Sequence, residues 1–150
     1  MAKGTPTSIL VRPAISRHQR RRDVGASGLC RLRLNPQRYG LLQLYDCFTP
    51  ALLIQIEDLG FCAKGEGGDW LASGISQPGG HKPLNTHGGM LSYCHPGNPG
   101  AMFGLTEAML QLRGQAAARQ LSGINTALCH AQGGIMSSHA TLILGNEDPS

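Results

Sequence analysis

The sequence is poor in charged and aromatic residues, and it has no long apolar run. Charged residues make up 15% and aromatic residues 5% of the 150 positions, whereas glycine occurs 21 times. No run of about 18 apolar residues exists, which excludes a typical membrane-spanning helix. A hydrophobic fraction of 41% at this length is typical of one globular domain, and the many glycines indicate tight backbone turns.

Closely spaced cysteine pairs are also absent. Five cysteines occur, at positions 30, 47, 62, 94 and 129. This odd, scattered set argues against a disulfide framework and against a zinc site, so a reducing compartment is favoured. No apolar segment typical of a secretory signal follows the start. We therefore expect a cytoplasmic protein, and the Arg-rich start leaves an organellar matrix open.

Acidic residues are nearly absent from residues 1–40, which hold nine of the thirteen Lys and Arg and one acid, Asp23. Because the remaining chain has more acids than bases, the pI of about 9.0 does not indicate nucleic-acid binding by the folded part. We expect a basic, disordered leader over residues 1–40, a domain over residues 41–145 and a tail over residues 146–150. A basic arm for nucleic acid or acidic lipid is disfavoured, because no aromatic residue lies among the arginines.

Apolar spacing and turn residues predict the first elements of the domain. Residues 41–45 predict a short strand, and apolar residues at helical spacing over residues 48–59 predict a helix. Thr49 is expected to cap this helix, Pro50 to occupy its first position and Gly60 to end it.

The second half of the domain shows a similar pattern. Residues 64–83, rich in Gly, Ser and Pro, predict a long loop. Residues 98–114 predict another helix, with Asn as the cap, Pro in the first position and Gly beyond the end. Residues 124–129 and 139–144 predict an antiparallel pair of strands joined across two glycines. This order of elements indicates an α/β fold.

Three segments place titratable side chains at predicted strand ends or in glycine-rich turns, where α/β sheets bind ligands. In chain order they resemble three motifs of the C-terminal half of thiolases of the sterol-carrier-protein type, and the similarity spans residues 41–145. Residues 45–48, Tyr-Asp-Cys-Phe, resemble the Asn-Glu-Ala-Phe motif of thiolases. Residues 85–97, with paired glycines and a His-Pro-Gly turn, resemble the loop that carries the acid/base histidine. Residues 130–134 resemble the loop in which many thiolases have Cys-x-Gly-Gly.

The resemblance implies a thiolase-like half-domain, a mixed sheet with packed helices that is incomplete at its N-terminal side. It also implies an acyltransferase of lipid metabolism that performs Claisen condensation or thiolysis on coenzyme A thioesters, with no permanently bound cofactor and no metal. Such chemistry needs a thiolate, acid/base groups and oxyanion donors. His95 would polarise the thioester oxygen and His130 would replace the second acid/base cysteine. The N–H groups of Gly133 and Gly134 would bind the second oxyanion, and Tyr45 would donate to an oxyanion or a proton. We expect these groups to converge.

Departures from the thiolase pattern leave other hypotheses open. The nucleophilic cysteine of thiolases belongs to their N-terminal half, and no cysteine here fits that role. We therefore expect the isolated chain to be inactive in thiolysis and to associate, as a dimer or with a complementing N-terminal half. Tyr45 stands where thiolases have Asn, and some members of the superfamily are carbon–carbon lyases. The second hypothesis is thus a retro-aldolase that acts with a small OB-fold partner, and the third is a non-catalytic remnant or interaction subunit.

Other candidate residues have simpler explanations. His139 is expected to point outward on the last strand, and His87 to lie around the site. Cys94 and Cys129, which neighbour the key histidines, are expected to be small buried thiols. The glycines in residues 65–68 do not form a phosphate-binding loop, because no Lys-Ser pair follows them at the start of a helix.

Overall fold

The structure is a computed structural model that describes residues 35, 38–97 and 99–146. The leader predicted for residues 1–40 therefore lies almost wholly outside the described residues, as does most of the predicted tail. Tyr39 is an exception, because its side chain is buried in the core of the domain.

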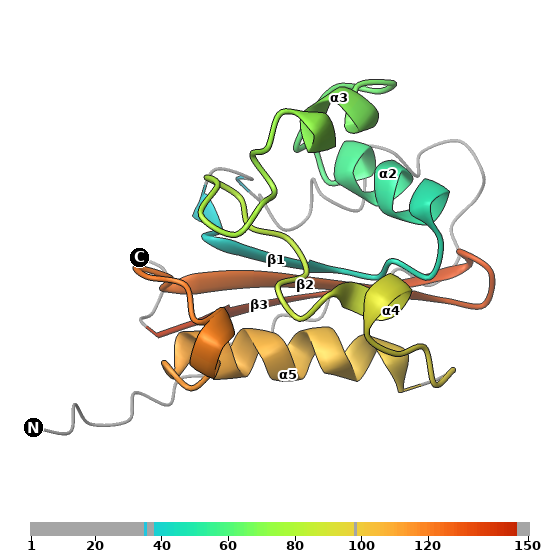
Figure 1. Ribbon diagram of the computed structural model, residues 1–150. Helices are drawn as coiled ribbons and strands as arrows, with labels where there is room; N and C mark the ends of the chain where they lie inside the picture. Colours follow the sequence, from blue (N-terminus) through green and yellow to red (C-terminus); the bar gives the residue numbers. More distant parts are fainter. Residues whose placement is uncertain (1–34, 36–37, 98, 147–150) are drawn as a thin grey trace, which may run out of the picture.

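Three strands form one mixed sheet in the order β1-β2-β3 (Figure 1). Strand β1 (Leu41–Leu44) pairs in parallel with β2 (Thr126–Gly133), which pairs antiparallel with β3 (Ser138–Gly145). The predicted mixed α/β sheet and its antiparallel hairpin are thus confirmed.

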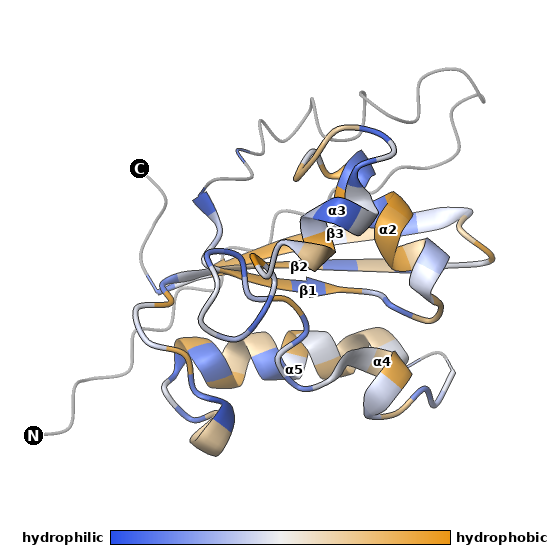
Figure 2. Ribbon diagram, turned by 45° about the horizontal axis from the view of Figure 1, so that its top comes forward, coloured by the Kyte–Doolittle hydropathy of each residue, from blue (hydrophilic) through white to orange (hydrophobic). Residues whose placement is uncertain are grey.

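Helices cover both faces of the sheet. Helices α2 (Thr49–Asp58) and α3 (Gly67–Ala72) lie on one face, and α5 (Gly100–Leu112) lies along the other (Figure 1). The short helix α4 (Gly89–Ser92) lies near the end of β1, and the 3-10 turn η2 (Ala117–Arg119) follows α5. Hydrophobic residues, shown in orange in Figure 2, occupy much of the three strands between these layers.

Strand β1 is buried on both faces, as expected for a parallel strand covered by helices on each side. Leu42 packs with Ile56 of α2, whereas Leu41 packs with Ala108 of α5. Leu41, Leu42, Ile56 and Ala108 each expose 0% of their surface. Burial of each large aliphatic side chain contributes about 1.5–3 kcal/mol, so the two clusters hold β1 firmly in place.

The helix starts differ from the predictions. Phe48, not Thr49, is the extended residue before α2, and no side chain caps this helix. The chain is already helical at Thr49, so Pro50 lies within the first turn, where its missing N–H has no cost. Helix α5 begins after Pro99 as its N-cap, and the predicted cap Asn98 lies outside the described residues.

The helix ends are confirmed, whereas the predicted loop over residues 64–83 contains a helix. Gly60 and Gly114 follow the two long helices with φ of 77° and 68°, a conformation that favours glycine. Helix α3 forms inside the predicted loop and carries Trp70, whose ring lies 6.1 Å from that of Phe61. This tertiary contact is invisible to a local pattern.

Strand β2 extends four residues past its predicted end. Each of its residues has a partner in β3, from Thr126 with Gly145 to Gly133 with Ser138. His130 therefore lies inside the strand and not at its end. Pairing with β3 continues the ladder through polar residues that interrupt the apolar pattern.

Candidate functional site

Two side-chain amides fix the backbone at the end of β1. Asn85 Oδ1 accepts from the Leu44 N–H and its Nδ2 donates to the Leu44 carbonyl, both at 2.9 Å. Gln55 of α2 makes the same double contact with Tyr45, accepting from its N–H at 3.2 Å and donating to its carbonyl at 2.6 Å. Paired amide contacts define both position and direction. Asn85 therefore holds Leu44 and Gln55 holds Tyr45 from outside the sheet, and sequence reasoning did not identify either amide.

The Tyr45 side chain meets His95, as the resemblance requires. The Tyr45 hydroxyl lies 3.2 Å from His95 Nε2, and the two rings are edge-on with centroids 5.9 Å apart. Burial, followed by the nearby Cys47 thiol, raises the pKa of Tyr45 above its usual value. The phenol is therefore neutral at physiological pH and can donate a proton to the imidazole.

Asp46 anchors the loop that leads to His95. Its Oδ1 accepts from the Met90 N–H at 2.7 Å, and the side chain is only 4% exposed. Gly89 has φ of 66°, and a Cβ there would collide with the Asp46 carboxylate. The paired glycines of the motif thus let the start of α4 approach Asp46 closely.

A cavity of about 210 Å³ opens beside these residues, between the sheet and the start of α5. Most of its lining is apolar, from Met90, Met102, Leu105 and Leu142, and Met102 is also 56% exposed. The titratable groups in the lining are Tyr45, Asp46, His87, Cys129 and His130. This combination of apolar walls and a few polar groups is typical of a small-molecule site.

His130 is fixed within the sheet beside the cavity, and strand alternation turns its side chain to the same face as Leu128, toward α2, whereas Cys129 and Leu142 face α5 and the cavity. Its carbonyl accepts from the Tyr45 N–H at 3.1 Å, which links the two residues across the parallel pair. Its Nδ1 lies 2.8 Å from Thr141 Oγ1, and its Nε2 lies 3.3 Å from His139 Nδ1. Burial, and secondarily the neighbouring His139, lowers the pKa of His130 to about 4, although Asp58 opposes this shift. The imidazole is therefore neutral at physiological pH.

His139 does not point outward as predicted. Its ring stacks on that of His130 with centroids 5.4 Å apart, and the side chain is half-buried. His130 and His139 are diagonal neighbours across the β2–β3 ladder, where His130 pairs with Thr141 and Gln132 pairs with His139. Strand alternation places them on the same face. The register between β2 and β3 determines this contact, and the sequence alone does not give that register.

Gly133 and Gly134 lie at the hairpin end and do not line the cavity. Gly133 closes β2, and Gly134 begins the turn with φ of 57°. The adjacent Gln132 donates to Cys47 Sγ at 3.5 Å, so the hairpin end lies beside the segment that follows Tyr45. The structure thus brings the Tyr45 and His95 side chains together, links Tyr45 to His130 through a backbone hydrogen bond, and leaves Gly133 and Gly134 outside the cavity lining.

His87 is a further histidine of the cavity wall. Its Nδ1 is buried and has no hydrogen-bond partner, and its ring packs edge-on against Tyr93 with centroids 5.9 Å apart. Burial lowers the pKa of His87, although Glu107 and Asp46 oppose the shift. The cavity wall therefore includes a neutral imidazole.

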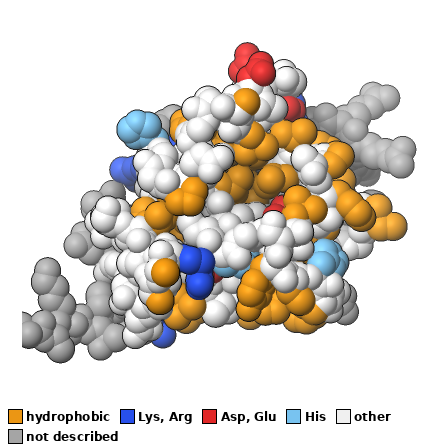
Figure 3. All heavy atoms as spheres, viewed as in Figure 1, with side chains coloured by type: hydrophobic (Ala, Val, Ile, Leu, Met, Phe, Trp, Pro, Cys, Tyr) orange, Lys and Arg blue, Asp and Glu red, His pale blue; other side chains and the backbone are white. Residues whose placement is uncertain are grey.

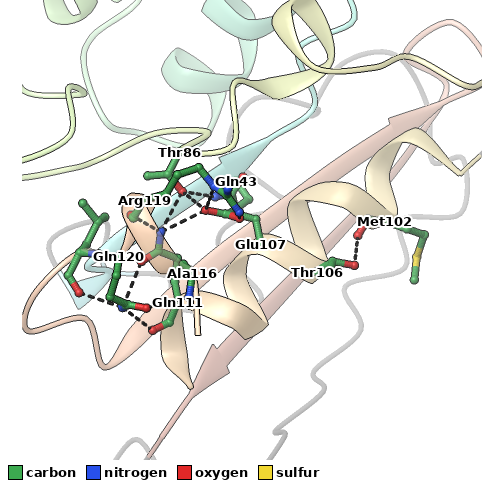
Figure 4. A network of polar contacts seen from close by, with 10 residues as sticks. Gln43, Thr86, Met102, Thr106, Glu107, Gln111, Ala116, Arg119 and Gln120 are labelled. Carbon is green, nitrogen blue, oxygen red and sulfur yellow. Dashed lines mark hydrogen bonds and ion pairs between the residues drawn. The ribbon is translucent and has the colours of Figure 1, made fainter. Parts of the chain in front are cut away.

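A polar network at the far end of α5 holds the loop that bears His87 (Figure 4). Glu107, 2% exposed, accepts from Arg119 Nη2 at 2.9 Å, from Thr86 Oγ1 at 2.8 Å and from Gln111 Nε2 at 3.0 Å. Burial alone would raise the pKa of Glu107, but these hydrogen bonds and the Arg119 charge hold it below its usual value. Gln43 of β1 donates to Thr86 at 3.4 Å and so connects this network to the cavity.

The described cysteines are free thiols. Burial raises the pKa of Cys129 to about 12, so its thiol is not a nucleophile near neutral pH. Cys94 is exposed and not buried as expected. In the described ranges no three His, Cys, Asp or Glu side chains are grouped to hold a metal ion, and no helix there is long and apolar enough to cross a membrane.

Several large hydrophobic side chains are exposed around the cavity end of the molecule. Phe48 is 71%, Tyr93 is 63%, Leu91 is 53% and Ile135 is 100% exposed. In Figure 3, hydrophobic side chains gather on the half of this face that carries α2, α4 and the start of α5. Such a surface is typical of a region that contacts another chain or domain.

A comparison with protein families identifies the family of the chain. A family model described as thiolase C-terminal domain-like matches residues 7–146. A 17-hydroxy-3-oxo-4-pregnene-20-carboxyl-CoA lyase of Mycobacterium tuberculosis is 43% identical over 114 residues, which are 75% of this chain and 28% of that protein. A steroid side-chain-cleaving aldolase of Thermomonospora curvata is also 43% identical over 114 residues, 75% of this chain and 27% of that protein.

Other similar proteins include an acyltransferase and a solved lyase. An acetyl-CoA acetyltransferase of Methanothermobacter thermautotrophicus is 35% identical over 68% of this chain and 27% of its own length. The solved structure of an Ltp2-ChsH2(DUF35) aldolase superimposes with a TM-score of 0.69 at 35% identity, over 83% of this chain and 31% of that chain. This chain thus spans less than a third of the length of these proteins.

Proposed function

Because the chain belongs to the family of thiolase C-terminal domain-like proteins, we propose that it forms the acid/base half of a carbon–carbon lyase site for coenzyme A thioesters. The pairing of the Tyr45 hydroxyl with His95 Nε2 at 3.2 Å beside the cavity carries this proposal. The names of the two relatives at 43% identity, a lyase and an aldolase, support cleavage without a thiol acceptor over the acyl transfer that the sequence first suggested.

The proposed reaction is a retro-aldol cleavage of a thioester that carries a hydroxyl group on its β-carbon. A base removes the hydroxyl proton, the carbon–carbon bond breaks, and the electrons move to the thioester as an enolate. The products are a ketone and a shorter acyl-CoA once the α-carbon takes up a proton. This step requires no nucleophilic cysteine and consumes no free coenzyme A.

Tyr45 and His95 suit the proton transfers of this reaction. A free phenolate would be costly, because burial already raises the pKa of Tyr45. When Tyr45 takes the substrate hydroxyl proton, it passes its own proton to His95 Nε2, so no separate phenolate forms. In the second step Tyr45 gives a proton to the α-carbon and regains one from His95 Nε2. The pair therefore ends in its starting state.

The remaining residues complete the proposed site. We assign His130, which lies in β2 beside the cavity, as a second acid/base group in the position of the second thiolase cysteine. The peptide N–H groups of Gly133 and Gly134, which lie next to Gln132 and its contact with Cys47, are assigned to the enolate oxygen. These assignments extend the site from the cavity to the hairpin end.

The exposed hydrophobic side chains at the cavity end support a site that another domain or protein chain completes. We assign this surface to a thiolase-like N-terminal half, a second copy or a small OB-fold partner, which the resemblance to lyases of the superfamily implies. The substrate is assigned as an acyl-CoA, and the relatives' names make 17-hydroxy-3-oxo-4-pregnene-20-carboxyl-CoA the first compound to test. No resident cofactor is proposed.

The test uses the protein that carries this chain, purified with any companion subunit that accompanies it. Incubated with that compound and no free coenzyme A, it should release ketone and acyl-CoA in equal amounts. Tyr45→Phe should lower kcat by about 10²- to 10⁴-fold, because the phenolic proton is lost. Tyr39→Phe, in the core away from the cavity, should retain the wild-type rate.

Two results would contradict the proposal. Product formation that requires one added coenzyme A per turnover would identify thiolysis, the acyltransferase reaction. An undiminished rate in Tyr45→Phe would remove Tyr45 from the reaction, whatever the substrate.

A further inference from the structure

Three hydrogen bonds connect a buried threonine to the hairpin turn through two imidazoles. Thr141 Oγ1 lies 2.8 Å from His130 Nδ1, and His130 Nε2 lies 3.3 Å from His139 Nδ1. His139 Nε2 in turn lies 3.1 Å from the carbonyl oxygen of Met136. Each imidazole nitrogen in this series therefore has one partner.

The chemistry of the last partner determines the direction of the whole series. A carbonyl oxygen only accepts, so His139 Nε2 carries a hydrogen. In neutral His139 the other nitrogen, Nδ1, is then a bare acceptor, and His130 Nε2 must donate to it. Neutral His130 consequently has a bare Nδ1, which accepts from the Thr141 hydroxyl.

We propose that His139 is a positioning residue, which fixes the proton of His130 on Nε2 and leaves Nδ1 as its basic nitrogen. The Met136 carbonyl at the turn defines the donor side of His139. The stacked arrangement, with 25° between the ring planes, keeps the two imidazoles in this relation. His139 thus acts on the site through His130 and touches no substrate in this scheme.

The consequence for catalysis rests on the proposed function. A proton that His130 accepts during the reaction goes to Nδ1, after the Thr141 hydroxyl turns away. The resulting imidazolium still donates from Nε2 to His139, which stabilises the positive charge. This arrangement parallels a catalytic histidine whose second nitrogen is held by a hydrogen-bonding partner.

The experiment reads the tautomer directly in the 150-residue chain. Long-range proton–nitrogen NMR spectra of the ¹⁵N-labelled chain at pH 8 distinguish a protonated from a bare ring nitrogen. This pH lies above the ordinary histidine pKa of about 6.5, and the low pKa of His130 also keeps it neutral. We expect His130 with a protonated Nε2 and a bare Nδ1.

Two substitutions of His139 form a matched pair. His139→Asn presents a side-chain oxygen in the place of Nδ1, so His130 should retain the proton on Nε2. His139→Leu keeps a similar volume but offers no acceptor. The His130 proton should then move to Nδ1 and be donated to Thr141. Amide spectra that match the wild type confirm that each variant is folded.

A third variant keeps the proposal testable if His139→Leu does not fold. Thr141→Val removes the partner of Nδ1, and the proton should remain on Nε2, because His139 still accepts from it. Wild-type His130 protonated on Nδ1 would overturn the proposal. An unchanged tautomer in folded His139→Leu, or a changed one in Thr141→Val, would do the same.

These measurements require no turnover, so they separate this proposal from the lyase reaction. If the lyase proposal fails, the protein releases no ketone while the tautomer remains as described. If the positioning role fails, the tautomer ignores His139 while cleavage proceeds. Where both hold, His139→Leu should lower kcat more than it changes KM, and His139→Asn should restore much of the loss.

Discussion

The two ends of α5 bear polar groups of opposite character. At the C-terminal end, Glu107 is buried, and its carboxylate receives hydrogen bonds from Arg119, Thr86 and Gln111. At the N-terminal end, α5 borders the cavity, whose wall includes His87 and its unpaired, buried Nδ1. Both ends lie against the same sheet (Figure 1). The two ends of α5 therefore differ in whether their buried polar atoms have hydrogen-bond partners.

The unpaired atoms gather at one side of the molecule. Among the described residues, the buried side-chain atoms without a hydrogen-bond partner are Gln43 Oε1, His87 Nδ1 and Gln132 Oε1. Gln43 and His87 line the cavity, and Gln132 contacts Cys47 next to it. An unpaired buried polar atom costs about 1–3 kcal/mol. Two of these three residues therefore line the cavity, where a substrate could supply the partner, whereas the Glu107 carboxylate accepts hydrogen bonds from protein groups alone.

The largest expected effect comes from breaking the ion pair between Arg119 and Glu107. Arg119→Met should lower the free energy of unfolding at pH 7 by about 2–4 kcal/mol, because the buried carboxylate of Glu107 loses its cation, whose half-exposed guanidinium is partly screened by solvent. Arg113→Met, on the exposed surface after α5, should change it by less than about 0.5 kcal/mol. Urea unfolding of both variants measures the difference.

The pH dependence of the same variant checks the cause. Without Arg119, the pKa of Glu107 should rise, since burial then dominates. The deficit relative to the wild type should therefore shrink between pH 7 and about pH 5, as Glu107 takes up a proton. A deficit that is equal at both pH values would indicate lost packing and not an uncompensated charge.

The second effect concerns the cavity end and the burial of neutral His130. Its folded pKa of about 4 lies below the unfolded value of about 6.5, so the unfolded state binds the proton first as pH falls. Stability from this residue is complete above about pH 6.5 and should decline by about 2–3 kcal/mol as pH falls to about 4. Urea unfolding over this range should show the slope in the wild type and a smaller one in His130→Asn. Parallel curves would contradict the burial of a neutral imidazole.

The sequence was sufficient to identify much of the fold, because local rules act there. Gly60 and Gly114 ended both long helices as predicted, since each adopts a positive φ. The apolar spacing identified the buried face of α2 at Leu52 and Ile56, whereas α5 also buries the polar residues Glu107 and Gln111 beside Ala108. Helix α3 and the extra residues of β2 were missed, because the contact of Trp70 with Phe61 and the pairing with β3 depend on distant partners.

The candidate site was predictable only in part, for a similar reason. Tyr45, His95 and His130 lie in recognisable motifs, and the structure brings the side chains of Tyr45 and His95 into contact. Asn85 and Gln55, whose amides fix the β1 end, carry no local signal of that role. The contact of His139 with His130 depends on the register between β2 and β3. The geometry of the hairpin turn sets this register, and the sequence does not define that geometry.

That turn provides the smallest effect, and it sharpens the contrast between the two ends. Ile135 and Met136 both have positive φ, 53° and 62°, although neither is glycine. The left-handed conformation costs about 1–2 kcal/mol for such residues, and Ile135 is 100% exposed, so no packing offsets the cost. Ile135→Asn should therefore raise the free energy of unfolding by about 1 kcal/mol, because asparagine tolerates this conformation. Ile135→Ala removes apolar surface but keeps the steric conflict, so it should change the free energy much less. If both variants are equally stabilised, exposed apolar surface and not backbone strain is the cause, and the cavity end stores less strain than its turn indicates.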